Sequence, residues 1–396
     1  MSVQRVKYLN RVIDQRAGND QPPLLAVSIH QGVIRRDTLT DGLPRAEDLS
    51  NYKLCEPGDI VLNRMRAFQG AIGVSPQRGL VSPDYAVLRP SPEADVRYLH
   101  HLFRSTWFVG EMISRLRGIG NTENGAVRTP RINPEDLGDI AVDFPSLDEQ
   151  RRIADFLDAE TARIDALLDA RRSQLELLVE RRFALIRELL QFGTCVGAPL
   201  QETGINWLPK CPATWQLNKL RLLSQCLDGK RIPLSAEERA TRKGEYPYYG
   251  ASTIVDYVDD YLFDEELVLL GEDGAQLGNP NYEISSVVNG KIWVNNHAHV
   301  LRPIGINASL LAAILNIFDR ELCMSGSTRE KITQDAMNAL LIPVPPTNEQ
   351  AALEQALTDR RTAQERVERG IREQVDLLAE RRQALITAAV TGGIAV

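Results

Sequence analysis

Cysteine, histidine and long apolar runs are all scarce in this sequence of 396 residues. No apolar run reaches the length of about 18 residues that crosses a bilayer, and the N-terminal segment MSVQRVKYLN lacks the apolar stretch of a secretory signal. The five cysteines form no Cys-x-x-Cys pair, which is typical of a reducing cytoplasm. They are Cys55, Cys195, Cys211, Cys226 and Cys323. We therefore expect a cytoplasmic protein.

The five histidines give little support to a metal site. They offer only the close pairs His100–His101 and His297–His299, and neither cysteine nor acidic residues stand nearby at the spacing that metal ligands need. We expect these histidines to be ordinary surface or core residues, and we expect no bound metal.

The sequence also contains fewer positively charged than negatively charged residues. The net charge is −7, whereas a protein that simply coats DNA is normally basic. Residues 1–143 carry a net charge of +1, and residues 194–343 carry −5. The composition is that of a soluble globular protein, and the length suits two or more domains. Any contact with nucleic acid must therefore come from local patches or with help from a basic partner.

An internal repeat with a period of 200 residues is the most informative feature of the sequence. Residues 144–193 align without a gap on residues 344–393, and fifteen of these fifty positions are identical. The clearest shared stretch is Glu-Arg-Arg-x-Ala-Leu-Ile, at 180–186 and again at 380–386. Chance does not produce such a match, so the chain contains two copies of one structural unit.

Each copy of the repeat predicts one long helix. Helix-forming residues dominate, and no proline follows the first few positions of either copy. Asp148 and Asn348 are possible N-caps after the prolines, and glycines at 193 and 392–393 are stop signals. A helix from about residue 148 to residue 191 is roughly 65 Å long.

Apolar residues at heptad spacing predict that these two helices form a coiled coil. The seam residues are Leu157, Ile164, Leu168, Leu175, Leu178, Leu185 and Leu189 in the first copy, and Leu357, Ile371, Val375, Leu378, Leu385 and Ala389 in the second. Polar residues interrupt the seam at Arg171, Arg182, Gln364, Glu368 and Arg382. The alternative is that each helix packs only on its own globular domain, but a heptad seam favours a facing helix.

The segments outside the helices mix short strand-like and short helical runs, which predicts an α+β protein of mixed type. We expect a first domain over 1–143, a first helix over 144–193, an exposed linker over 194–215, a second domain over 216–343, and a second helix with its tail over 344–396. The helices stay similar while the domains diverge. The helices are therefore expected to act as a shared scaffold, and the domains to recognise different targets.

These motifs resemble the specificity (S) subunits of type I restriction–modification systems, over essentially the whole chain. The resemblance is carried by the Pro-x-x-x-Glu-Gln helix starts at 145–150 and 345–350 and by the two Glu-Arg-Arg-x-Ala-Leu-Ile stretches. SPDYAVLRP (82–90), LPKCPATW (208–215) and EYPYYGAS (245–252) add to it. Each motif is weak alone, whereas their order and spacing together are specific.

The resemblance implies two globular α/β target recognition domains and two conserved helices in an antiparallel coiled coil, related by an approximate two-fold axis. Each domain would read one half of a bipartite site on double-stranded DNA, and the helices would set the separation. It also implies two methyltransferase (modification) subunits and motor-nuclease (restriction) subunits as partners. S-adenosylmethionine would be bound by the methyltransferase subunits, with neither cofactor nor catalytic residue in this chain.

Two other functions were weighed against this one. A methyltransferase with its own specificity domains would need a Gly-rich cofactor loop and an Asn/Asp-Pro-Pro-Tyr/Phe motif. Asn279-Pro280-Asn281-Tyr282 fails at its third position, and an Asn-Pro turn explains it better. GEDGAQLG (271–278) lacks the Lys-Ser/Thr of a phosphate-binding loop. A coiled-coil adaptor that never touches DNA is compatible with the negative charge.

Loop residues of the two domains that could read base edges or phosphates are Arg, Lys, Asn, Gln, Ser and Tyr. In the first domain they are Arg64, Arg66, Gln69, Asn121, Asn124, Arg128 and Arg131. In the second they are Lys230, Arg231, Tyr248, Tyr249, Lys291, Asn295, Asn296, Ser327, Arg329 and Lys331. For any one of them the competing interpretation is a solvated surface residue or an internal salt bridge. The loops ahead of the two long helices are the strongest candidates, because both are cationic and contain or border glycine.

Overall fold

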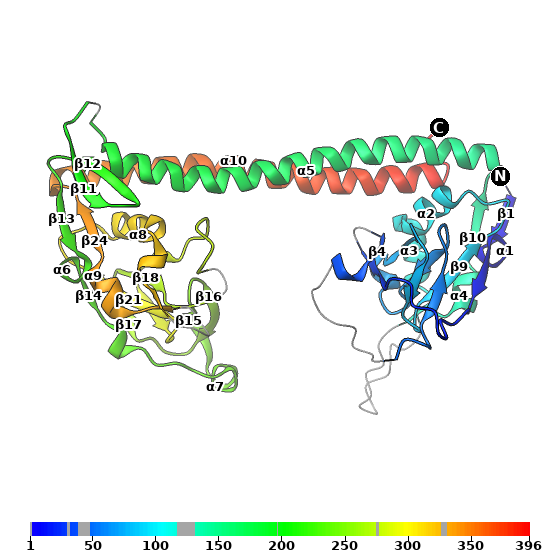
Figure 1. The fold of residues 1–396 in the computed structure, drawn as a ribbon, viewed down its shortest axis with the longest axis horizontal. Coiled ribbons are helices and arrows are strands. Elements are labelled where there is room, and N and C mark those ends of the chain that lie inside the picture. Colours follow the sequence, from blue (N-terminus) through cyan, green and yellow to red (C-terminus); the bar gives the residue numbers. More distant parts are fainter. Residues whose placement is uncertain are drawn as a thin grey trace. The chain divides into compact units, whose positions relative to one another are not determined.

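A computed structural model describes residues 2–29, 32–38, 48–116, 131–195, 197–274, 277–325 and 331–396. The chain forms two compact units (Figure 1). The first contains residues 1–171 and 373–396, and the second contains residues 172–372. The unit boundaries fall inside the long helices and not at their ends, so each unit contains part of both helices.

The two long helices are α5 (Leu147–Phe192) and α10 (Thr347–Val390), which confirms the predicted elements to within a few residues. Both begin within two residues of a proline, Pro145 and Pro346, and no proline lies inside either helix. Gly193 and Gly392 follow the last turns with φ of 66° and 73°, a left-handed conformation that glycine adopts without a steric penalty. The local sequence signals therefore determine where these helices end.

Within each unit, α5 and α10 lie side by side and antiparallel (Figure 1). In the first unit, Arg152 donates to the carbonyl of Val396 at 3.5 Å, and Arg382 donates to Asp165 at 2.8 Å. Higher numbers on α5 thus meet lower numbers on the C-terminal segment. The interpretation that each helix packs only on its own domain is wrong.

The second unit shows the same pairing direction. Gln364 donates to the carbonyl of Leu178 at 2.7 Å, and Arg360 donates to that of Leu185 at 3.3 Å. Arg182 donates to Glu368 at 2.7 Å. Four of the five polar residues that interrupt the predicted seam, Arg182, Gln364, Glu368 and Arg382, therefore join the helices.

Burial on the long helices follows the predicted seam. Leu157, Ile164, Leu168, Leu189, Ile371 and Ala389 are buried, and the remaining seam leucines and Val375 are half-buried. Part of this burial comes from the globular domains, because Ile386 and Ala389 of α10 belong to the core of the first unit. The helix of the second copy thus also supports the first domain.

The first globular domain is built on a four-stranded antiparallel sheet in the order β2-β9-β6-β7. Strand β6, buried at every residue, forms the middle of the sheet, and α2 covers one side of it. The elements are β1 (Ser2–Arg5), α1 (Val6–Leu9), β2 (Asn10–Ile13), β3 (Leu25–Ser28), β4 (Gly32–Arg35), η1 (Arg36–Thr38), β5 (Lys53–Cys55), β6 (Ile60–Leu62), η2 (Ala67–Gln69), β7 (Ile72–Val74), β8 (Gly79–Val81), β9 (Ala86–Pro90), α2 (Val96–Arg104), α3 (Thr106–Ile113), α4 (Pro134–Gly138) and β10 (Ala141–Phe144).

The second globular domain repeats this arrangement with the sheet order β14-β21-β18-β19 and adds a second four-stranded sheet, β16-β15-β20-β17. The elements are β11 (Leu200–Ile205), β12 (Leu208–Pro212), β13 (Gln216–Lys219), α6 (Leu220–Leu223), β14 (Ser224–Cys226), η4 (Asp228–Lys230), α7 (Ala236–Thr241), β15 (Lys243–Tyr249), β16 (Ile254–Val258), β17 (Phe263–Asp264), β18 (Leu267–Gly271), β19 (Ser285–Val288), β20 (Lys291–Val294), β21 (Ala298–Pro303), α8 (Ala308–Ile317), η5 (Arg320–Leu322), β22 (Met324–Ser325), β23 (Lys331–Ile332), α9 (Gln334–Ala339) and β24 (Leu341–Val344).

A buried glutamine joins each domain to its long helix. In the first unit, Gln150 accepts a hydrogen bond from the backbone N–H of Asp95 at 2.8 Å. Its amide donates to the carbonyls of Glu93 at 3.2 Å and Pro145 at 3.0 Å. Asp95 is the N-cap of α2, so one side chain fixes the start of α2 against the start of α5.

Gln350 makes the same three bonds in the second unit. It accepts from the N–H of Asn307 at 2.8 Å and donates to the carbonyls of Gly305 and Pro345, both at 3.1 Å. Asn307 is the N-cap of α8. The glutamine of the repeated Pro-x-x-x-Glu-Gln motif is therefore kept because it positions the domain on the helix.

The interpretation of residues 194–215 as an exposed linker is wrong. Strands β11 and β12 pair as an antiparallel hairpin, and Ile205, Leu208, Cys211 and Trp215 are buried in the core of the second unit. The indole of Trp215 also donates to Glu349 of α10 at 2.8 Å. The glycines and prolines of this segment mark the turns and ends of a hairpin, which composition alone does not distinguish from a linker.

Candidate nucleic-acid interface

In the first domain, the segment after β6 holds the end of the loop that precedes α4. The Arg64 guanidinium donates to the carbonyl of Ile132 at 2.9 Å and to the side chain of Asn133 at 2.8 Å. The backbone N–H of Ile132 in turn donates to the carbonyl of Arg64 at 3.3 Å. Arg64 therefore fixes the base of the loop, and two of its three guanidinium nitrogens donate inside the domain.

Three other predicted residues of the first domain lie at the surface around this base. Arg66 and Gln69 are exposed in the turn that contains η2, and Arg131 is exposed directly before Ile132. Two cations and an amide thus flank the position that Arg64 fixes. The remaining predicted residues, Asn121, Asn124 and Arg128, lie outside the described residues.

In the second domain, the equivalent base is a network of charges. Arg231 donates to Glu272 at 3.0 Å and contacts Asp228 at 3.3 Å, and Lys331 contacts Glu272 at 3.1 Å and Asp273 at 3.4 Å. These ion pairs occupy both predicted cations within the domain. Ser327 and Arg329, also predicted for this loop, lie outside the described residues.

Two predicted residues of the second domain are buried and serve its interior. The hydroxyl of Tyr248 accepts from the backbone N–H of Leu234 at 2.9 Å, and its ring lies under the Arg239 guanidinium. The side-chain oxygen of Asn295 accepts from the backbone N–H of His297 at 2.8 Å. A buried side chain cannot reach a base edge in a groove without rearrangement, so these two residues are weak candidates for direct contact.

Four predicted residues of the second domain lie at its surface. Lys230 and Asn296 are exposed, and Tyr249 is half-buried, with burial raising the pKa of its hydroxyl. Lys291 is exposed, and its ammonium stands 4.7 Å from the ring centroid of Tyr261. These residues keep polar groups available for a ligand.

A pair of tyrosines on the second sheet lies outside the residues predicted from the sequence. Tyr261 is 37% exposed, and Tyr246 packs against it with ring centroids 5.2 Å apart. Lys291 stands over both Tyr246 and Tyr261. Aromatic rings beside a cation suit contacts with sugar and base edges. Tyr257 is 51% exposed, but it pairs with Pro247 and so lies on the other face of the sheet from Tyr246. The β-branched and aromatic run Ile-Val-Asp-Tyr-Val over β16 was the signal that could have indicated this strand.

Comparison with known proteins identifies the family of this chain. The pattern of the type I restriction modification DNA specificity domain matches residues 32–177 and again residues 212–376. The chain belongs to this family. Each match covers most of one sheet domain and much of the long helix that follows it. The family unit is therefore one domain together with its helix, and the chain contains two such units.

Individual relatives of the specificity family agree with this assignment. A Haemophilus influenzae protein named as a type I restriction enzyme specificity subunit is 33% identical over 155 residues, which are 39% of this chain and 37% of that protein. The EcoDI specificity subunit of Escherichia coli is 27% identical over 186 residues, 46% of this chain and 39% of that one. The matched segments thus span less than half of these relatives.

A solved structure shares the fold over nearly the full length. It was described in work on complex assembly and conformational transition of the type I R-M system. The match covers 99% of this chain and 98% of the other, with a TM-score of 0.68 and 18% identity. At this identity the likeness shows the fold alone.

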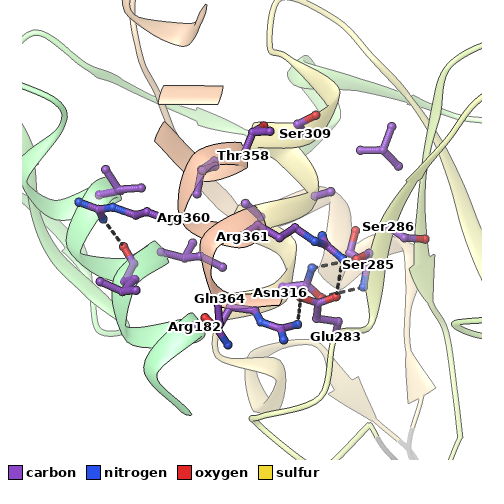
Figure 2. A pocket seen from close by; sticks show the side chains of 17 residues that line it. Arg182, Glu283, Ser285, Ser286, Ser309, Asn316, Thr358, Arg360, Arg361 and Gln364 are labelled. Carbon is purple, nitrogen blue, oxygen red and sulfur yellow. Dashed lines mark hydrogen bonds and ion pairs between the residues drawn. The ribbon is translucent and has the colours of Figure 1, made fainter. Parts of the chain in front are cut away.

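The second specificity domain also has a cavity of about 290 Å³ between α5, α10, α8 and β19 (Figure 2). Several of the polar side chains that line the cavity form hydrogen bonds with neighbouring groups. Asn316 accepts from the N–H groups of Ile284 and Ser285 at 2.8 and 2.9 Å, and Arg182 donates to Glu283 at 3.0 Å. The Arg182 contact joins α5 to the domain, and the Asn316 contacts join α8 to the start of β19 inside the domain.

The first domain fills the equivalent space with larger side chains. When α2 and α8 are aligned on their N-caps, His101 and Arg104 correspond to Ala313 and Asn316. His101 bonds Asp158 of α5 at 2.7 Å, where the second unit has Thr358. The cavity therefore follows from smaller residues at this junction.

The described residues of this specificity chain hold no group of three His, Cys, Asp or Glu side chains that could bind a metal. Asn279–Tyr282, the nearest match to a methyltransferase motif, forms a turn in which Tyr282 N–H donates to the Asn279 carbonyl at 3.1 Å. This confirms the turn interpretation of that segment. In the described part of the chain, no helix is long and apolar enough to span a membrane.

Proposed function

We propose that this chain is the sequence-reading subunit of a type I restriction–modification complex, and that each globular domain reads one half of a bipartite DNA site. One observation carries the proposal. Two domains with the same sheet order and the same glutamine clamp present different residues at the same place, the base of the loop before the long helix. A shared scaffold with divergent surfaces is what two different half-sites require.

In this proposal, the helices set the positions of the two domains, and the domains determine which DNA sequence is recognised. Arg66, Gln69 and Arg131 are the first domain's best candidates for contact with bases or phosphates, because they are exposed beside a fixed loop base. In the second domain, Lys230, Lys291 and the exposed tyrosines take this place. The residues predicted from the sequence but outside the described ranges stay predictions.

Two methyltransferase subunits are proposed to dock on the repeated helices. Leu177 in the second unit is 62% exposed, and its repeat Leu377 in the first unit is 63% exposed. An exposed leucine recurs at the same position of both copies, away from the seam, which suits a contact that is made twice. Each copy would hold one methyltransferase subunit, which would bring S-adenosylmethionine and the catalytic residues. The motor-nuclease subunits would join this assembly.

The net charge of −7 fits a subunit whose partners supply much of the contact with phosphates. We propose no catalytic role for this chain, because both matched segments belong to a DNA specificity domain. The competing proposal, an adaptor that never touches DNA, predicts that the chain has no influence on which sequence is methylated.

Exchange of residues 1–143 for the equivalent domain of a relative tests the proposal. The chimera is expressed with its matched methyltransferase subunits, and methylated adenines are mapped across the genome. One half of the methylated site should change, and the other half should stay the same. The matched control exchanges residues 216–343 and should change only the other half.

The outcomes separate the alternatives. If either exchange altered both half-sites, the two domains would read DNA as one surface. If neither exchange altered the site, the adaptor function would be favoured. Since Gln150 and Gln350 bind backbone groups of the domains, the exchanged domains should be held by the same clamp.

A further inference from the structure

His299 lies in strand β21 of the second domain, and only 3% of its surface is exposed. Its Nδ1 lies 2.6 Å from a carboxylate oxygen of Asp228, and its Nε2 lies 2.9 Å from the carbonyl oxygen of Ile332. Both partners can only accept hydrogen bonds. Both ring nitrogens must therefore carry a proton, and the imidazole is held as a buried cation.

Charged side chains surround His299. Asp228, Glu272 and Asp273 supply three negative charges, and Arg231 and Lys331 supply two positive charges. A protonated His299 brings this sum to zero. Two further titratable groups contact the cluster: His297, whose ring lies 2.9 Å from Asp273, and the Cys226 thiol beside Asp228, whose pKa burial raises to about 11.

The protonation state of His299 follows from opposing effects. Burial by itself lowers its pKa, but the hydrogen bond to Asp228 and that to the Ile332 carbonyl raise the pKa above its ordinary value of about 6.5. The same contact with His299 lowers the pKa of Asp228 against the effect of burial. Both shifts favour the charged forms of His299 and Asp228 over the neutral forms.

His299 joins the two segments of this domain that carry loop candidates for DNA contact. Asp228 opens the turn η4, which contains Lys230 and is followed by Arg231. Ile332 ends β23, directly after Lys331. The second oxygen of Asp228 accepts from the N–H of Val300 at 2.9 Å, so the turn is fixed to the central sheet as well.

The first domain holds the same loop base with different chemistry. There the N–H of Ile132 bonds the carbonyl of Arg64, as the N–H of Ile332 bonds the carbonyl of Glu272 at 2.8 Å. The strand position of His299 is occupied by Ala86, since Leu88 and Leu301 occupy the same register against β6 and β18. The first domain thus holds its loop base with an arginine where the second domain uses a histidine.

We propose that His299, protonated on both ring nitrogens, is the positioning residue that holds the 228–231 turn and the 331–332 strand together for DNA recognition. Recognition by the second domain is then sensitive to pH, and recognition by the first domain is not. This inference rests on the proposed function of the chain. Because a raised histidine pKa stabilises the arrangement below that pKa, the arrangement is complete at pH 6 and is lost as the pH rises through the pKa of His299.

Two measurements test the proposal. The first is nitrogen NMR of the full chain with labelled histidine, assigned with the variant His299→Gln. Two protonated ring nitrogens are expected at pH 6.5. A single neutral tautomer at that pH overturns the proposal without reference to DNA.

The second measurement is the affinity of the chain, assembled with its methyltransferase subunits, for duplexes that contain both mapped half-sites or only one of them. Between pH 6 and pH 9, the contribution of the second domain's half-site should fall about tenfold or more, the loss expected for one charged hydrogen bond. The contribution of the first half-site should stay constant. An equal fall for both half-sites, or none for either, overturns the proposal.

The variant Asp228→Asn separates positioning by charge from simple packing. Its amide can donate to Nδ1 of a neutral imidazole, whose Nε2–H still donates to Ile332, so both bonds survive without the charge. Its carbonyl can still accept from Val300. Binding should therefore remain selective, and its dependence on pH should disappear, together with the doubly protonated NMR signal. Persistence of the same pH dependence in this variant overturns the proposal.

Failure of the proposed function has a different signature. Absence of selective binding at every pH, with the NMR signal of protonated His299 intact, would overturn the DNA-reading function and this inference with it. Selective but pH-independent binding would overturn this inference alone.

Discussion

Replacement of Gln350 by alanine should specifically loosen the second domain from its helix. The change removes three hydrogen bonds of 2.8 to 3.1 Å and leaves the N–H of Asn307 and the carbonyls of Gly305 and Pro345 without their partner. An unsatisfied buried group costs about 1–3 kcal/mol, and water can reach some of these groups in the variant. We expect a loss of about 3 kcal/mol in the free energy of unfolding of the second unit.

The loss should be local before it is global. Asn307 accepts from the N–H groups of Ser309 and Leu310 at the start of α8, and its own N–H is held by Gln350. Hydrogen exchange of the first turn of α8 should therefore speed up by about two orders of magnitude, the equivalent of about 3 kcal/mol. Exchange in α2 of the first unit should be unchanged.

A matched control lies one turn and a half along the same helix. Gln355 is exposed and bonds only Asp359, so Gln355→Ala should change the free energy of unfolding by no more than about 0.5 kcal/mol. The variant Gln150→Ala should reproduce the loss in the first unit. If Gln350→Ala matched the Gln355 control in both denaturation and exchange, the clamp would not be what positions the domain.

Two further predictions concern the helices and the chemistry. Insertion of four residues at matched positions of α5 and α10, about one turn and 6 Å, should change the gap between the methylated half-sites while both half-sites stay the same; a changed half-site in the methylation map would contradict the scaffold role. The purified chain should bind no S-adenosylmethionine, and stoichiometric binding in a calorimeter would contradict a purely recognising role.

Local sequence patterns were enough for the long helices and the order of the domains. Residue propensity, a proline start and a glycine stop act over a few positions, so α5 and α10 could be predicted to within a few residues. The repeat likewise predicted their pairing, because a heptad seam of this length needs a facing helix. Even the polar interruptions carried information, since Arg182 and Gln364 became contacts between the helices.

Only the tertiary structure decided which predicted residues are available for DNA. Arg64 and Arg231 look like free cations in the sequence, but Arg64 donates to groups 68 and 69 positions away, and Arg231 donates to a carboxylate 41 positions away. Whether a polar side chain faces solvent or a distant carbonyl depends on how the chain returns to it, and no local pattern encodes this. For the same reason, the hairpin at 200–212 and the clamp role of Gln150 could not be predicted from local sequence. The second proton of His299 could not be predicted either, because the two acceptors of this side chain lie on a separate turn and a separate strand.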